Sequence, residues 1–174
     1  MNRRDRVRAH LLESADVKRQ VLETCLEQIL AAVDLIVGTF KTGGKMLLCG
    51  NGGSAADSQH MAAEFVSRLT KDFGRPGLPA IALTTDTSFL TAYANDVDLD
   101  GVFARQVQAL GKPGDVLVGI STSGNSVNVI RAVETARQTN LKIIMLTGGG
   151  GRLASMQQYP ICSRSVPCHR THLM

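Results

Sequence analysis

The chain has 174 residues, of which 44% are hydrophobic and 20% are charged, so it is long enough for one well-buried core but too short for two domains of ordinary size. Only 4% of the residues are aromatic and none is tryptophan, which argues against the stacking surfaces that bind single-stranded nucleic acid. The net charge of +4 is modest. Much of it comes from an arginine cluster near the N-terminus, which we interpret as the solvated start of a helix.

The sequence contains neither a membrane-span pattern nor a signal-peptide pattern. Its apolar runs are shorter than the roughly 20 residues that cross a bilayer, and its first residues lack an uninterrupted hydrophobic stretch. None of the four cysteines is part of a CxxC motif, so we interpret them as reduced structural thiols. These features predict a cytoplasmic protein without a membrane partner, and they disfavour a nucleic-acid partner.

Residues 1–40 form the first expected element, a helical segment. Apolar residues between Val21 and Val37 recur at the spacing of one helix face, with charged residues between them. The pattern is satisfied by one long helix or by two. Because a small domain rarely has enough surface to cover such a segment, we expect it to contact a second copy of the chain.

Residues 41–174 alternate between short apolar segments and helical patterns, which predicts an α/β fold with a parallel sheet between helices. The expected strands are 45–50, 79–83, 116–121, 142–147 and 160–166. The expected helices are 55–69, 87–94 continuing through 102–110, 126–138 and 152–157, and a surface loop is expected at 71–77.

Two of the expected strands are followed by similar small, polar loops, 51–54 and 121–126. In open parallel sheets, ligands bind outside the carboxyl ends of the strands. We therefore expect the two loops to converge on one ligand.

The first of these loops leads into a helix that carries His60 and Glu64. Its glycines allow backbone amides to approach a ligand, and the helix N-terminus adds partial positive charge, so a phosphate or sugar oxygen fits there. His60 and Glu64 are four residues apart and share one helix face. They are either a solvated ion pair or a titratable pair beside a ligand, and the loop before them favours the second.

The second loop supplies several hydroxyl groups at a helix start, from Ser121, Thr122, Ser123 and Ser126. Hydroxyl and amide donors can replace the water that a phosphate loses on binding. The alternative is that Asn125 or Ser126 simply caps the helix. The loop is neither a Walker loop nor a GxGxxG turn, which disfavours a nucleotide.

Three motifs together resemble a known family: CGNGGSAADSQHMAAE at 49–64, TTDTSFLTAYANDVD at 84–98 and GDVLVGISTSGNSVNVIRAVE at 114–134. They resemble the sugar-isomerase (SIS) domain and, within it, the phosphoheptose isomerases. The resemblance covers nearly the whole chain and implies that 41–174 form a SIS domain with a five-stranded parallel sheet. It also implies a homotetramer with shared active sites that converts sedoheptulose 7-phosphate to D-glycero-D-manno-heptose 7-phosphate, for the heptose of lipopolysaccharide or related glycans.

The resemblance also assigns roles to individual residues. Glu64 would be the base that moves a proton between C1 and C2 through an enediol, and His60 and Glu64 would be zinc ligands. A carboxylate suits proton removal next to a carbonyl, and a metal or an acid can stabilise the oxyanion that forms. The implied substrate-binding set is Asn51, Gly52, Gly53, Ser54, Glu64, Asn95, Asp96, Ser121, Thr122, Ser123 and Ser126. Of these, Asn95 and Asp96 are explained equally well as an ordinary turn.

The family's site also includes a C-terminal helix that begins Gln-Glu-x-x-His. The sequence ends at 165–174, where that helix is expected. We therefore expect the helix, with two further zinc ligands and the catalytic acid, to be absent from this chain. His169 and His172 are disfavoured as replacements, because a terminal segment positions ligands poorly.

Three functions are compatible with these observations. The first is isomerisation of a phosphorylated heptose. The second is a non-catalytic SIS adaptor like the DnaA-initiator-associating protein, and the third is a regulatory domain that binds a sugar phosphate. Glu64 favours the first over the second, because those adaptors lack a glutamate there. The third stays open, since the binding residues are complete and the catalytic ones are not.

Overall fold

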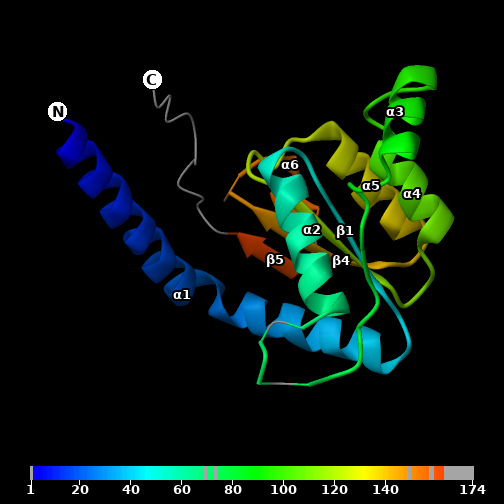
Figure 1. The fold of residues 1–174 in the computed structure, drawn as a ribbon, viewed down its shortest axis with the longest axis horizontal. Coiled ribbons are helices and arrows are strands. Elements are labelled where there is room, and N and C mark those ends of the chain that lie inside the picture. Colours follow the sequence, from blue (N-terminus) through cyan, green and yellow to red (C-terminus); the bar gives the residue numbers. More distant parts are fainter. Residues whose placement is uncertain (1, 69, 73, 149, 157–158, 163–174) are drawn as a thin grey trace.

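The long N-terminal helical segment is a single helix, α1 (Arg3–Lys41), in a computed structural model that describes residues 2–68, 70–72, 74–148, 150–156 and 159–162. The helix begins where the side chain of Asn2 accepts a hydrogen bond from the N–H of Asp5 (2.9 Å), as an N-cap residue does. It ends before Gly43, whose φ of +79° suits glycine. Figure 1 shows its C-terminal half lying against the domain and its N-terminal half extending away.

The sheet is parallel, as expected, and its five strands lie in the order β2-β1-β3-β4-β5 in the part of the chain that the structure describes. The strands are β1 (Met46–Gly50), β2 (Ala80–Ala82), β3 (Val116–Ser121), β4 (Lys142–Thr147) and β5 (Tyr159–Cys162). Every residue of β1 and β3 is buried, which explains their continuous apolar sequence. Strands β1 and β3 are neighbours, with Gly50 opposite Ile120. Their carboxyl ends therefore lie at the same edge.

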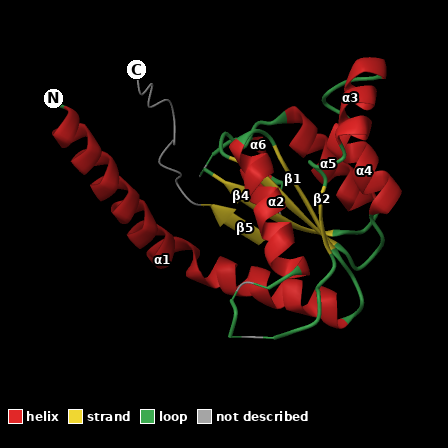
Figure 2. Cartoon of the chain, viewed as in Figure 1, coloured by secondary structure: helices red, strands yellow, loops and turns green. Residues whose placement is uncertain are grey.

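Helices cover both faces of the sheet (Figure 2). They are α2 (Gly53–Val66), α3 (Thr87–Asp96), α4 (Val102–Leu110), α5 (Val127–Gln138) and α6 (Arg152–Ser155). On one face, α1 and α2 pack on the sheet residues that include Leu48 and Val118. On the other face, α3 to α6 pack on a cluster that includes Leu47 and Leu117. Burial of such side chains stabilises the fold by about 1.5–3 kcal/mol each.

The continuous helix expected at 87–110 is wrong, because α3 ends at Asp96 and α4 begins at Val102. The side chain of Asp98 accepts a hydrogen bond from the N–H of Gly101 and another from Arg131 on α5 (2.8 Å). The bond from Arg131 lowers the pKa of Asp98. A contact distant in sequence therefore holds the turn between the two helices.

Several other boundaries differ from the expected ones. Helix α2 begins at Gly53 and ends at Val66, earlier than expected at both ends, and α6 ends at Ser155. The last strand begins at Tyr159, and residues 163–166 of the expected strand lie outside the described residues. No helix in the described part of the chain is long and apolar enough to cross a membrane.

Candidate active site

The two loops that follow β1 and β3 lie side by side, because the two strands are paired and end at the same level. A pair of side-chain amides connects them. Asn51 Nδ2 donates to Asn128 Oδ1, and Asn128 Nδ2 donates to Asn51 Oδ1. Each of these hydrogen bonds has a length of 2.9 Å. The two similar loops therefore lie next to each other, as expected, and their binding of one ligand stays a prediction. Asn128, on the first turn of α5, was not identified from the sequence, since it lies in the middle of an ordinary helical pattern.

The serine loop, residues 121–126, is held by its own hydrogen bonds. Ser121 Oγ and Ser126 Oγ are 2.9 Å apart, and Ser123 Oγ accepts from the N–H of Asn125 (3.2 Å). The side chain of Ser126 makes no capping bond to α5, and Asn125 Nδ2 donates to the carbonyl of Ser123. The simple capping interpretation is therefore wrong, and the partial positive charge at the start of α5 is available to an anion.

A second part of the chain, residues 148 and 150–153, supports the serine loop. Gly148 and Leu153 donate to the carbonyls of Thr122 (3.2 Å) and Gly124 (2.8 Å). Gly124 has a φ of +66°, and a Cβ atom there would lie 2.0 Å from the carbonyl oxygen of Gly150. Only glycine fits this position, so the loop has one well-defined conformation. The only sign of this support in the sequence is the glycine run at 148–151. The pattern of strands and helices gives no reason to place that run beside the serine loop.

The first loop also depends on glycine. Gly52 has a φ of +55°, and α2 starts at Gly53 without a side-chain cap. Asn51, Gly52 and Gly53 are exposed and Ser54 is half-buried. The loop therefore presents main-chain atoms at the carboxyl edge of β1, as a close approach to a ligand requires.

His60 and Glu64 form a pair further along α2, where His60 Nε2 lies 3.8 Å from Glu64 Oε1. The His60 side chain is 76% exposed, but that of Glu64 is only 29% exposed. Glu64 Oε2 is buried and has no hydrogen-bond partner among the described residues. A purely solvated ion pair does not account for this buried oxygen, because burying an unpaired carboxylate oxygen costs free energy.

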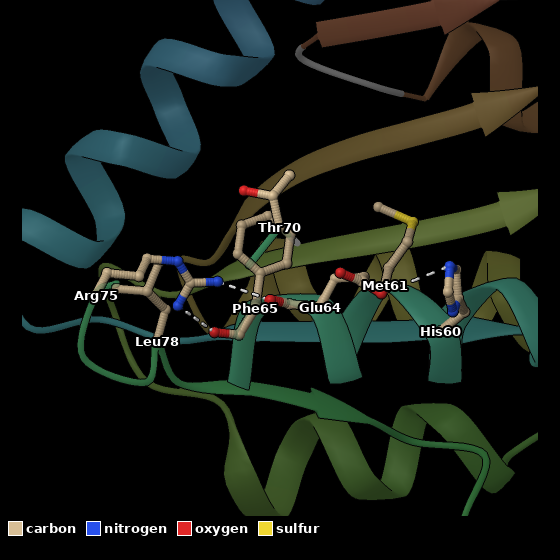
Figure 3. A pocket seen from close by; sticks show the side chains of 7 residues that line it. All are labelled: His60, Met61, Glu64, Phe65, Thr70, Arg75 and Leu78. Atoms are coloured by element: carbon tan, nitrogen blue, oxygen red, sulfur yellow. Dashed lines mark hydrogen bonds and ion pairs between the residues drawn. The ribbon is translucent and has the colours of Figure 1, made fainter. Parts of the chain in front are cut away.

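The pair borders a cavity of about 630 Å³ (Figure 3). Its wall is largely apolar apart from His60, Glu64 and Arg75, and it is lined by His60, Met61, Glu64, Phe65, Thr70, Arg75 and Leu78.

Arg75 fixes the end of the helix that carries Glu64. Its guanidinium donates to the carbonyls of Glu64 (2.6 Å) and Phe65 (2.7 Å), and Figure 3 shows it next to Phe65. These carbonyls belong to the last turn of α2, where a cation also interacts favourably with the helix dipole. The sequence predicts only a surface loop at 71–77 and does not reveal this role of Arg75.

The structure does not bring all the predicted site residues together within one chain. Glu64 lies about 16 Å along α2 from Gly53, at a rise of about 1.5 Å per residue, and no residue of either loop lines the cavity beside Glu64. Asn95 and Asp96 are the exposed last residues of α3, where Asn95 Nδ2 donates to Asp96 Oδ1 (2.8 Å). Their contact with a sugar stays a prediction.

The donors at His60 and Glu64 fit part of a zinc site. Imidazole nitrogen and carboxylate oxygen are both zinc ligands, and the unpartnered Glu64 Oε2 is free to take that role. The described residues contain no group of three or more His, Cys, Asp or Glu side chains arranged to hold a metal. His169 and His172 lie outside the described residues. His60 and Glu64 would therefore supply two ligands of the zinc site that the resemblance implies, and this site stays a prediction.

Comparison with known proteins gives a consistent result. The SIS domain family model matches residues 10–148. The chain is 50% identical to a phosphoheptose isomerase of Methylibium petroleiphilum over 95% of its own length and 82% of the relative's. It is 55% identical to one of a Roseiflexus species over 91% of its own length and 78% of the relative's.

Solved structures agree. A phosphoheptose isomerase from Neisseria gonorrhoeae has a TM-score of 0.84 at 46% identity, and one from Francisella tularensis has 0.86 at 35%. In both cases the match covers 98% of this chain and 89% of the other. The chain therefore belongs to the SIS domain family, among the phosphoheptose isomerases.

Proposed function

We propose that the chain isomerises sedoheptulose 7-phosphate to D-glycero-D-manno-heptose 7-phosphate, in the cytoplasm, as a step of heptose biosynthesis. The observation that carries this proposal is the 50% identity to a phosphoheptose isomerase over 95% of the chain. A half-buried glutamate with an unpartnered oxygen favours an enzyme over a domain that only binds sugar phosphates.

The serine loop would bind the phosphate group. Its hydroxyls come from Ser121, Thr122, Ser123 and Ser126, and α5 begins directly after them. The support from residues 148 and 150–153 holds these donors in place before the phosphate arrives, which reduces the entropy lost on binding. The loop 51–54 and the pair Asn95–Asp96 would contact the sugar hydroxyls.

Glu64 would act as the base. It would take a proton from C1 of the ketose, which leaves an enediol across C1 and C2, and would return a proton to C2. A hydroxyl proton moves from O1 to O2 in the same conversion, so product and substrate have the same atoms. Contacts to parts of the substrate remote from these carbons would hold C1 next to the carboxylate. General base catalysis of this kind raises the reaction rate by about 10²–10⁴-fold.

We propose that each active site combines the serine loop of one copy with Glu64 of another. The two lie near opposite ends of α2 within a chain, and the resemblance implies a homotetramer with shared sites. Exposed apolar residues on α1, which are Val7, Leu11, Leu12, Leu22, Leu26, Leu30, Val33 and Val37, support contact between copies.

His60 and Glu64 would hold the zinc ion implied by the resemblance, together with other donors. When bound, zinc would stabilise negative charge on the substrate oxygens.

The proposed function is tested by incubating the purified chain with sedoheptulose 7-phosphate, with and without added zinc, and following the aldose product by NMR. We expect turnover, and isothermal calorimetry in parallel should show binding of the sugar phosphate. Binding without turnover under either condition would favour the regulatory domain. Neither binding nor turnover at millimolar substrate would exclude both.

A further inference from the structure

The two side-chain amides that connect the loops bond to each other in both directions. Asn51 and Asn128 exchange two hydrogen bonds of 2.9 Å, and Asn128 Oδ1 also accepts from the N–H of Val129 (3.0 Å). The Asn128 residue is only 7% exposed. A reciprocal pair of this kind is sensitive to geometry, because a shift of either loop breaks both bonds and leaves polar groups buried without partners.

This pairing changes the role that Asn51 can have. Both polar atoms of its side chain bond to Asn128, which fixes the orientation of the amide and leaves it one further N–H and one further lone pair. The loop can still offer main-chain N–H groups to a sugar, at the uncapped start of α2, where Gly52 and Gly53 lie. Asn51 can therefore contribute to the site by holding these groups in place.

Asn128 is also fixed relative to the phosphate end. It lies on the first turn of α5, two residues after Ser126, whose hydroxyl pairs with that of Ser121 (2.9 Å). A displacement of the serine loop is thus transmitted through α5 to Asn128 and from there to Asn51.

We propose that Asn128 is a positioning residue that sets the distance between the sugar-binding and phosphate-binding loops, and that the Asn51 side chain acts through this pair. The inference rests on the proposed function. It predicts that loss of Asn128 impairs recognition of a ligand that spans both loops, and spares a ligand that needs only the serine loop.

The test is a double-mutant cycle with Asn51→Ala, Asn128→Ala and the double variant, in which KM and kcat are measured for sedoheptulose 7-phosphate. Inorganic phosphate, as a competitive inhibitor, reports on the serine loop alone. We expect each single variant to raise KM about tenfold, as for loss of a buried hydrogen bond. The inhibition constant of phosphate should change less than about twofold, and the double variant should be no worse than the poorer single one.

A matched control is Thr139→Ala at the far end of α5, where the hydroxyl bonds only to the helix's own carbonyls at Thr135 and Ala136. It should leave KM unchanged. Thermal unfolding of each variant would separate a loss of folding from a loss of positioning.

Asn128→Asp keeps the shape of the side chain and provides a second test if the alanine variants fold poorly. Its carboxylate accepts from Asn51 but cannot donate back, whereas the protonated carboxyl can donate. We therefore expect the activity of this variant relative to the wild type to rise as the pH is lowered, which a purely steric role would not produce.

Additive effects of the single variants, or a larger effect of Asn51→Ala than of Asn128→Ala, would overturn the inference, since either result means that the Asn51 side chain acts on the substrate directly. Equal weakening of phosphate and sugar phosphate would also overturn it. A wild-type chain that neither binds nor turns over the sugar phosphate would instead remove the proposed function itself.

Discussion

The serine loop and the surroundings of Glu64 are built in opposite ways. The serine loop is internally bonded, supported by residues 148 and 150–153 and connected to the neighbouring loop by Asn128. Glu64 faces an open cavity with one oxygen unpartnered among the described residues. The difference supports the proposal that a single chain completes the phosphate end of the site, whereas the proton-transfer end needs a second copy.

The largest expected effect follows from removing the base. Glu64→Gln keeps the size of the side chain but cannot accept a proton, so we expect turnover to fall by about 10²–10⁴-fold. Binding of sedoheptulose 7-phosphate, measured by calorimetry, should stay within a few-fold of the wild type. Asp57→Asn, which changes an exposed carboxylate on the same helix, is the matched control and should leave both unchanged. Equal turnover in Glu64→Gln would mean that another group is the base.

The next largest effect is expected in the serine loop, on its affinity for phosphate. Gly124→Ala places a Cβ against the Gly150 carbonyl at a positive φ, which costs about 1–3 kcal/mol of local strain. We expect the serine loop to shift and phosphate affinity to fall about tenfold or more, as measured by inhibition with inorganic phosphate. Gly43→Ala also has a positive φ but meets no atom within 4 Å. This control should lose stability alone, and an equal loss of phosphate affinity in it would contradict the proposed role of the loop.

A smaller effect is expected from Arg75. Arg75→Ala removes the donors to the carbonyls of Glu64 and Phe65, and loss of such a cap costs about 1 kcal/mol. Because the end of α2 then frays, kcat should fall several-fold while phosphate affinity stays the same. Arg75→Lys, which restores the charge but not both bonds, should give an intermediate value. A change confined to phosphate affinity would show that Arg75 acts on the serine loop and not on Glu64.

The smallest effect on activity is expected at the opposite edge of the sheet. Burial of Asp115 raises the pKa of its carboxyl, but hydrogen bonds from the Lys45 side chain and from the N–H groups of Lys45 and Lys112 outweigh it and lower the pKa. The stabilisation is present above the unfolded pKa of about 3.9 and is lost as the pH falls through the lower folded value. Asp115→Asn should therefore lower the unfolding temperature at neutral pH, flatten the loss of stability in acid, and leave KM unchanged.

Much of the fold could be predicted from the sequence, because buried parallel strands have a continuous apolar pattern. Strands β3 and β4 were predicted to the residue. The break between α3 and α4 was anticipated only as the alternative of a turn at Asn95 and Asp96, since the bond from Arg131 to Asp98 that holds it is distant in sequence.

For the candidate site, the sequence predicted which types of residue take part, but not which of them contact each other or how far apart they lie. The convergence of the two loops followed from neighbouring parallel strands, but the partner of Asn51 lies far away in the sequence and has no motif of its own. The separation of Glu64 from the serine loop was not recognised, although it follows from the direction and length of α2.

The central claim is that the serine loop and Glu64 act together from different copies of the chain. It is tested most directly by mixing two impaired variants, Glu64→Gln and Gly124→Ala, unfolding and refolding them together so that copies exchange, and measuring turnover at a concentration of sedoheptulose 7-phosphate that leaves Gly124→Ala far from saturation. We predict that the mixture regains activity well above either variant alone, because some sites then pair an intact Glu64 with an intact serine loop. No recovery in mixed oligomers, verified by differently tagged copies, would contradict the claim and place the whole site within one chain.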